Sequence, residues 1–107
     1  MQWQNLMARV DGIEAAFLRV KASAEMFMGG DEASKERSFQ DIFALNNEVG
    51  RLARERPKTM PMMKELQAYV NMITVGIKHG KIGDVSEGIA MAQESIKAMR
   101  KELSSLP

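Results

Sequence analysis

The chain has 107 residues, a hydrophobic fraction of 45%, a charged fraction of 27% and a formal net charge of +1. This balance is typical of one globular domain, residues 1–107, and excludes a disordered chain. A net charge near zero gives no general reason to expect a nucleic acid or an anionic membrane as partner. The chain contains no cysteine, so disulfides and thiolate metal sites are excluded.

Targeting signals are not visible in the sequence. The first residues lack the basic and apolar regions of a secretory signal peptide. The longest apolar runs are only a few residues, far below the roughly 20 that cross a bilayer. We therefore expect a cytoplasmic protein without a membrane segment.

The first predicted helix covers residues 3–28. Its apolar residues alternate four and three positions apart, the spacing of a helix that packs on other helices. Gly29 and Gly30 follow, and glycine adopts the left-handed geometry of a helix C-cap without steric cost. The predicted stripe consists of Leu6, Val10, Ile13, Phe17, Val20, Ala24 and Phe27.

The second predicted helix covers residues 32–56, with Asp31 or Ser34 as its cap and Pro57 after its end. It carries a broad apolar face formed by Phe39, Ile42, Phe43, Leu45, Val49, Leu52 and Ala53. Asn46 falls inside this face. Since a core-facing Asn reduces stability but specifies register or partner choice, we interpret Asn46 as a polar specificity residue of the core.

Two more helices are predicted, over residues 60–79 and 84–105. Gly80 ends the third helix, and Asp84 with Glu87 forms a variant of the N-terminal capping box for the fourth. The third stripe contains Met62, Met63, Leu66, Tyr69, Val70, Ile73 and Ile77. The fourth contains Val85, Ile89, Ala92, Ile96, Met99, Leu103 and Leu106.

The links between these four helices are short, and short links make consecutive helices antiparallel neighbours. The fold class expected is therefore all-α, an antiparallel up-down-up-down four-helix bundle. Two alternatives are a fourth helix that packs in another subunit and a homodimer that shares one bundle.

No residue pattern indicates a metal, a cofactor or a catalytic centre. The only histidine, His79, lies between Lys78 and Lys81, where a divalent ion would be repelled. The thioethers of residues 60–63 suit Cu(I), but Met62 and Met63 also belong to the predicted core stripe. No nucleotide-binding glycine motif or nucleophile–base pair is present. We therefore expect a protein that is not an enzyme and has no metal or cofactor.

Cations collect at one end of the predicted bundle, where the second helix ends, the third begins and the fourth ends. We call this set the basic pole: Arg51, Arg54, Arg56, Lys58, Lys97, Arg100 and Lys101. It could bind an acidic protein, a phosphate-bearing ligand or a nucleic acid, with Trp3 as a nearby aromatic anchor. Cations at helix C-termini are, however, also favoured by the helix dipole without any partner.

Among the apolar residues outside the predicted stripes are Met72, Val75 and Met91. We refer to them as the off-stripe residues and interpret them as a second candidate partner surface. The chain is also methionine-rich, with 10 Met, and flexible thioethers suit both irregular cores and adaptable binding surfaces.

The leading functional prediction is a small non-enzymatic protein–protein interaction module: a regulator, adaptor, export-type chaperone or accessory subunit. We expect its partner to be another protein, for example an acidic one, or a second copy of the chain. A nucleic-acid-binding accessory protein that uses the basic pole ranks lower. A small helical enzyme or ligand sensor, with a site among Glu14, Lys21 and Asn46, ranks last.

Overall fold

The protein is an antiparallel four-helix bundle in the computed structural model, which describes residues 2–105 and the side chains of residues 4–105. Its elements are α1 (Gln2–Met28), α2 (Ser34–Glu55), the 3₁₀ helix η1 (Pro57–Thr59), α3 (Met60–His79) and α4 (Ile82–Ser104). The principal extents are 45 × 19 × 18 Å. The predicted fold class is confirmed.

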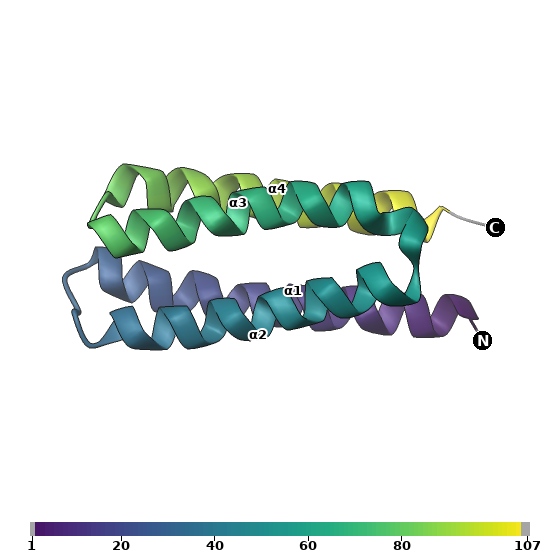
Figure 1. Cartoon of the computed structure of the whole chain (residues 1–107), viewed down its shortest axis with the longest axis horizontal. Coiled ribbons are helices and arrows are strands. Elements are labelled where there is room, and N and C mark those ends of the chain that lie inside the picture. Colours follow the sequence, from purple (N-terminus) through teal and green to yellow (C-terminus); the bar gives the residue numbers. More distant parts are fainter. Residues whose placement is uncertain (1, 106–107) are drawn as a thin grey trace.

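The arrangement in space follows the chain order. Figure 1 shows α1 beside α2 in one layer and α3 beside α4 in the other, with α2 and α3 nearer the viewer. The α1–α2 and α3–α4 turns lie at one end, and the start of α1 and the end of α4 lie with the α2–α3 connection at the other. The basic pole was predicted for this second end. None of the described helices has the length and apolar character of a membrane span.

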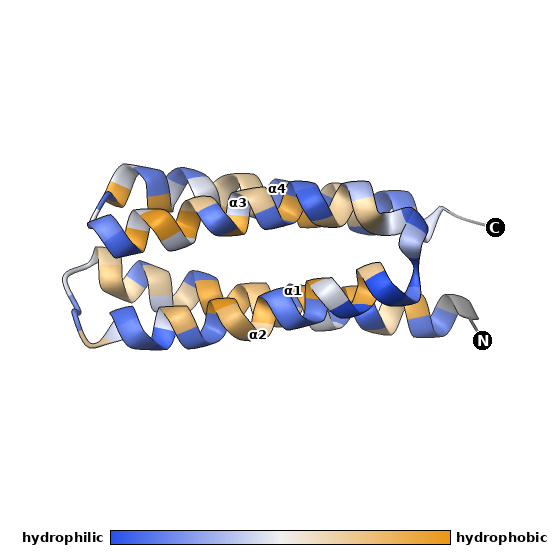
Figure 2. Ribbon diagram, viewed as in Figure 1, coloured by the Kyte–Doolittle hydropathy of each residue, from blue (hydrophilic) through white to orange (hydrophobic). Residues whose placement is uncertain are grey.

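Apolar stripes from all four helices meet in one buried cluster. All the predicted stripe residues of α1 are buried, and so are those of α4 as far as Leu103. Figure 2 shows these stripes as hydrophobic segments that alternate with hydrophilic ones along each helix. Because α4 buries its stripe within its own chain, it needs no second subunit. The side chains of Trp3 and Leu106 lie outside the described part of the chain.

Small residues bring the helices of each layer close together. A Cβ atom on Gly88 of α4 would lie 2.8 Å from Ile73 Cγ1 of α3, and one on Gly76 would lie 2.8 Å from Val85 Cγ2. In the other layer, Ser23 and Ser38 are buried between α1 and α2, and Ser23 Oγ donates to Asp41 Oδ2 at 2.9 Å. The two layers are therefore tight helix pairs, and contacts between the layers are sparser.

Glycine ends two helices as predicted. Gly30 and Gly80 have φ values of +106° and +68°, and the next residue donates its amide back into the helix, Asp31 to Met26 O and Lys81 to Gly76 O. This is the hydrogen-bond pattern of a Schellman C-cap.

The predicted starts of two helices need correction. Helix α4 begins at Ile82, so Asp84 lies in its first turn. The predicted capping box of Asp84 and Glu87 is therefore wrong. The reason is that the amides of Asp84 and Val85 already donate to Lys81 O, each at 3.1 Å. Helix α2 begins at Ser34, and Asp31 instead accepts hydrogen bonds from Ala33 N and Ser34 Oγ in the preceding turn.

Candidate functional site

An open groove is lined by residues of α2 and α3. These are the two helices nearer the viewer in Figure 1. The groove is a shallow, open depression with a volume of about 680 Å³, and no charged side chain lines it. We call it the α2/α3 groove and define it by its lining residues: Phe39, Ile42, Phe43, Asn46, Gln67, Asn71 and Thr74. It is larger than the hollow of about 480 Å³ at the α2–α3 connection and the hollow of about 370 Å³ between α1 and α2.

The groove exists because bulky residues separate the two layers where small ones draw each layer together. Ile42 of α2 and Met63 of α3 are buried in the core, and Phe39 packs partly against the same cluster. No glycine allows a close approach here, unlike at Gly88 between α3 and α4. Side chains of this size hold two helices apart and leave a furrow along their outer edge.

Phe43 is the most exposed large apolar side chain among the described residues, at 68%. Its predicted place on the core face is therefore wrong. The core seam of α2 runs through Ser38, Ile42, Leu45, Val49 and Leu52, which leaves Phe43 on the outer rim of the groove. The half-buried Phe39 lies one turn before it, so the two rings form an apolar strip at the groove wall.

Asn46 is also exposed, so its predicted role as a polar residue of the core is wrong. It follows Leu45 on the seam by one position, which turns its side chain out of the core and toward the groove. Asn46, Gln67 and Asn71 together give the groove three carboxamide groups. No side-chain hydrogen bond of these groups to another described residue is found, so both their donors and acceptors are open to a ligand.

The off-stripe residues do not form one patch with the groove. Val75 is 42% exposed and follows groove residue Asn71 by one turn, so it borders the groove on α3. Met72 is half-buried on a different side of α3. Met91, which is 41% exposed, belongs to α4. Only Val75 of this set is placed to extend the groove.

The basic pole is partly compensated by acidic residues of the same chain. Arg100 Nη2 donates to Asp11 Oδ1 at 2.7 Å and to Glu14 Oε1 at 3.0 Å. Arg51 Nη1 lies 3.7 Å from Glu48 Oε2. These two cations of the predicted pole therefore serve ion pairs within the bundle.

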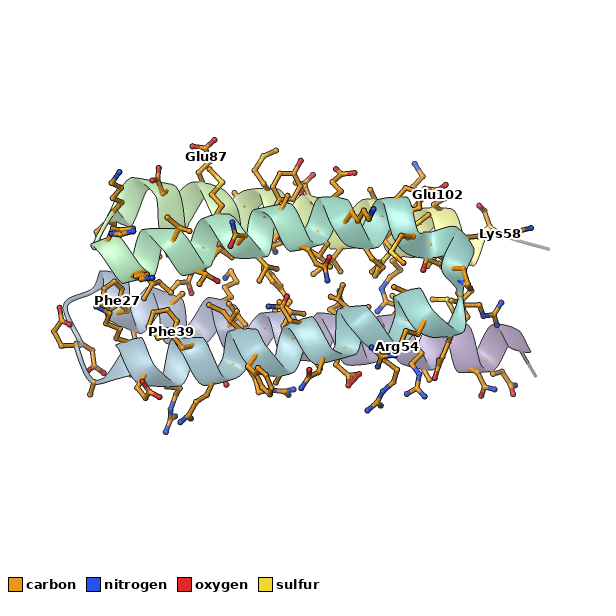
Figure 3. The ribbon with its side chains drawn as sticks, viewed as in Figure 1. Phe27, Phe39, Arg54, Lys58, Glu87 and Glu102 are labelled. Atoms are coloured by element: carbon orange, nitrogen blue, oxygen red, sulfur yellow. The ribbon has the colours of Figure 1, made fainter. Side chains whose placement is uncertain are left out.

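The rest of the pole is more open. Figure 3 shows Arg54, Lys58 and Glu102 near the end of the bundle where the α2–α3 connection lies. Arg56 and Lys58 line a hollow of about 480 Å³ there, together with Glu55, Glu102 and apolar residues, so its charge is balanced. The cations of the pole without an ion-pair partner among residues 4–105 are Arg54, Lys58, Lys97 and Lys101.

A further ion pair joins α1 to the end of α2. Arg9 donates from Nε to Glu55 Oε1 at 2.8 Å and from Nη2 to Glu55 Oε2 at 2.9 Å. This bidentate interaction with Arg9 holds the pKa of the Glu55 carboxyl below its usual value. In the same way, the hydrogen bond to Asp11 raises the pKa of Arg100.

The three residues of the enzyme or sensor hypothesis do not share one site. Glu14 accepts a hydrogen bond from Arg100 of α4, and Lys21 Nζ lies 3.4 Å from Glu25 Oε2 on its own helix. Asn46 lies in the α2/α3 groove instead. Each of these side chains thus has separate surroundings, and the predicted convergence is wrong.

No group of three or more His, Asp or Glu side chains that could hold a metal ion is found among the described residues. His79 is exposed at the end of α3, and Met63 is fully buried in the core. Met60 and Met62 are at the start of α3, and only Met60 counts as exposed. The thioethers of residues 60–63 therefore point to different surroundings.

Comparison with protein families, with curated proteins and with solved structures finds no match to this chain. The geometry of the bundle and its surface is therefore the basis of the functional argument.

Proposed function

We propose that the protein is a small non-enzymatic interaction module of the cytoplasm, serving as a regulator, adaptor, export-type chaperone or accessory subunit. It binds a protein partner through the face formed by α2 and α3. The observation that carries the proposal is Phe43, exposed at 68% on the wall of an uncharged groove. An exposed phenylalanine contributes little to the stability of the fold. If a partner buries it, the same side chain contributes strongly to binding.

Two further features support this face. The carboxamides of Asn46, Gln67 and Asn71 line the groove and can bond to the backbone or polar side chains of a partner. Arg54, one of the pole cations without an ion-pair partner among residues 4–105, is on the same helix as Phe43. The basic pole thus contributes to the proposed surface mainly through Arg54, with Lys58 beyond it at the α2–α3 connection.

The proposal is tested with Phe43→Glu and a matched control, Leu18→Glu. Leu18 is 53% exposed and lines a smaller hollow between α1 and α4, so it is a similar change on a different face. Tagged full-length proteins are expressed in the native host, and co-purified proteins are compared by quantitative mass spectrometry. Light scattering gives the mass of each complex, and circular dichroism confirms that both variants fold.

We expect the wild type and Leu18→Glu to retain the same partner and Phe43→Glu to lose it. Retention by all three proteins, or a monomer that captures nothing in any form, contradicts the proposal. Release of bound nucleic acid by Arg54→Glu, without loss of a protein, would favour the nucleic-acid alternative instead.

A further inference from the structure

We infer that the partner segment is an amphipathic helix with acidic residues toward both of its ends, laid along the α2/α3 groove. This inference rests on the proposed function and specifies the chemistry of the partner. Four cations placed by helical spacing around the groove carry it: Lys35, Arg54, Lys64 and Lys78.

The cations lie beyond the two ends of the groove. Lys35 precedes Phe39 by one turn, and Lys78 follows Thr74 by one turn, so these two flank one end. At the other end, Lys64 precedes Gln67 by three residues and Arg54 follows Asn46 by eight.

Figure 3 shows Phe39 and Arg54 at well-separated positions along α2.

These cations are not used inside the bundle. None of the four has an ion-pair partner among residues 4–105. Glu32 and Glu36 are exposed near Lys35, and Glu65, which follows Lys64, accepts a hydrogen bond from Tyr69 Oη at 3.4 Å. The lining itself has no charge, so these four cations without an ion-pair partner among residues 4–105 flank an uncharged middle.

The dimensions suit a helix of moderate length. Nineteen positions separate Lys35 from Arg54, which at 1.5 Å per residue is roughly 28 Å, or about five helical turns. Phe39 and Phe43 are one turn apart and can pack against partner residues with the same spacing. A helix in this furrow would lie along α2 and α3 much as the helices of the bundle lie along each other.

A second copy of the chain fits this face poorly. Antiparallel pairing of two such faces brings the Lys35 end against the Arg54 end, and parallel pairing brings each end against itself. Cations meet cations in both cases. A single-stranded nucleic acid would need cations along its whole track, but no residue of the groove lining is charged.

The test is a displayed library of helical peptides of about five turns, selected on the full-length protein. A leucine stripe is fixed, and the flanking positions vary among Glu, Lys, Gln and Ala. We expect enrichment of Glu toward both ends and no enrichment on Phe43→Glu. For the selected peptide, Lys35→Glu with Lys78→Glu should weaken binding about fivefold or more. The control Arg19→Glu with Arg37→Glu makes the same net charge change in the α1–α2 hollow and should change binding less than about twofold.

The outcomes separate this inference from the proposed function. Enrichment that depends on Phe43 but favours neutral or basic ends overturns the acidic partner and leaves the docking face intact. Absence of any Phe43-dependent enrichment overturns both. Self-association of the protein alone in sedimentation velocity, or tighter binding of an oligo-dT probe than of any peptide, overturns the acidic helix in favour of a second copy or a nucleic acid.

Discussion

Arg100 of α4 donates a hydrogen bond from Nη2 to Asp11 Oδ1 of α1 at 2.7 Å. The same nitrogen contacts Glu14 Oε1 at 3.0 Å, so one guanidinium joins two acidic residues a turn apart on the neighbouring helix. A cation that the sequence placed in a partner-binding pole thus fastens the last helix of the bundle to the first.

Replacing Arg100 should destabilise the bundle modestly. We expect Arg100→Gln to lower the free energy of unfolding by about 1 kcal/mol or less, because its ion pairs are partly exposed. The loss should shrink as salt rises, since salt screens such pairs. Urea unfolding at low and high salt measures both effects. The adjacent Lys101→Gln, which removes no ion pair, is the control; equal stability of the two variants at low salt would contradict the assignment.

The ion pair between Arg9 and Glu55 should make stability depend on pH in the acid range. The hydrogen bonds from Arg9 lower the folded-state pKa of Glu55 below its unfolded-state value. The pair therefore stabilises the fold at pH values above the unfolded-state pKa, and this contribution disappears as pH falls through the folded-state pKa. Unfolding of wild type and Glu55→Gln across this range should show a difference near neutral pH that vanishes in acid.

A direct measurement can check the same interaction. Carboxyl NMR titration should give a lower pKa for Glu55 in the wild type than in Arg9→Gln. Identical pKa values in the two proteins would mean that the pair does not persist in solution.

The close approach of α3 and α4 should make Gly88 sensitive to substitution. An alanine Cβ would lie 2.8 Å from Ile73 Cγ1 and 3.1 Å from Ile73 N, so backbone as well as side chain must shift. Such overpacking costs about 1–3 kcal/mol, only partly offset by the helix propensity of alanine. Thermal and urea unfolding measure the change. Gly83→Ala, which meets nothing within 4 Å, should be neutral or stabilising by up to about 1 kcal/mol.

The exposed position of Phe43 predicts a contrast with a buried phenylalanine. Phe43→Ala should change the free energy of unfolding by less than about 0.5 kcal/mol, as surface substitutions usually do. Phe17 is 2% exposed, and Phe17→Ala should cost about 3–5 kcal/mol through loss of packing. If both substitutions cost the same large amount, Phe43 belongs to the core after all.

The sequence predicted the architecture well because each helix has an apolar period and clear stops. The bounds of α3 agree at both ends, and Gly30 and Gly80 take the left-handed geometry expected of them. The starts of α2 and α4 were predicted less accurately. A side chain that can cap a helix does not determine where the helix begins, because the first backbone amides can already donate to an earlier carbonyl. Asp84 illustrates this: the turn at Lys81 had already begun the helix.

The groove could not be predicted, because the core seam of α2 contains a serine. Ser38 is fully buried, and its hydroxyl donates to Ser34 O at 2.8 Å, which satisfies it without a polar partner across the helices. Counting only apolar residues shifted the predicted face toward Phe43 and Asn46. The regular alternation from Ser38 through Ile42 to Leu45 was the signal that could have excluded both. The ion pairs of Arg100 with Asp11 and Glu14 join distant segments, so no local pattern reveals them, whereas the pair of Arg51 with Glu48 is local to α2.

The central claim is that the α2/α3 face is covered by a partner, and site-specific photo-crosslinking tests it most directly. Benzoylphenylalanine replaces Phe43 in one full-length protein and Leu18 in another, and both are irradiated in the native host. Crosslinks to one discrete protein from position 43, and none from position 18, are the result we expect. Crosslinks from position 18 alone, or from neither position, would contradict the account.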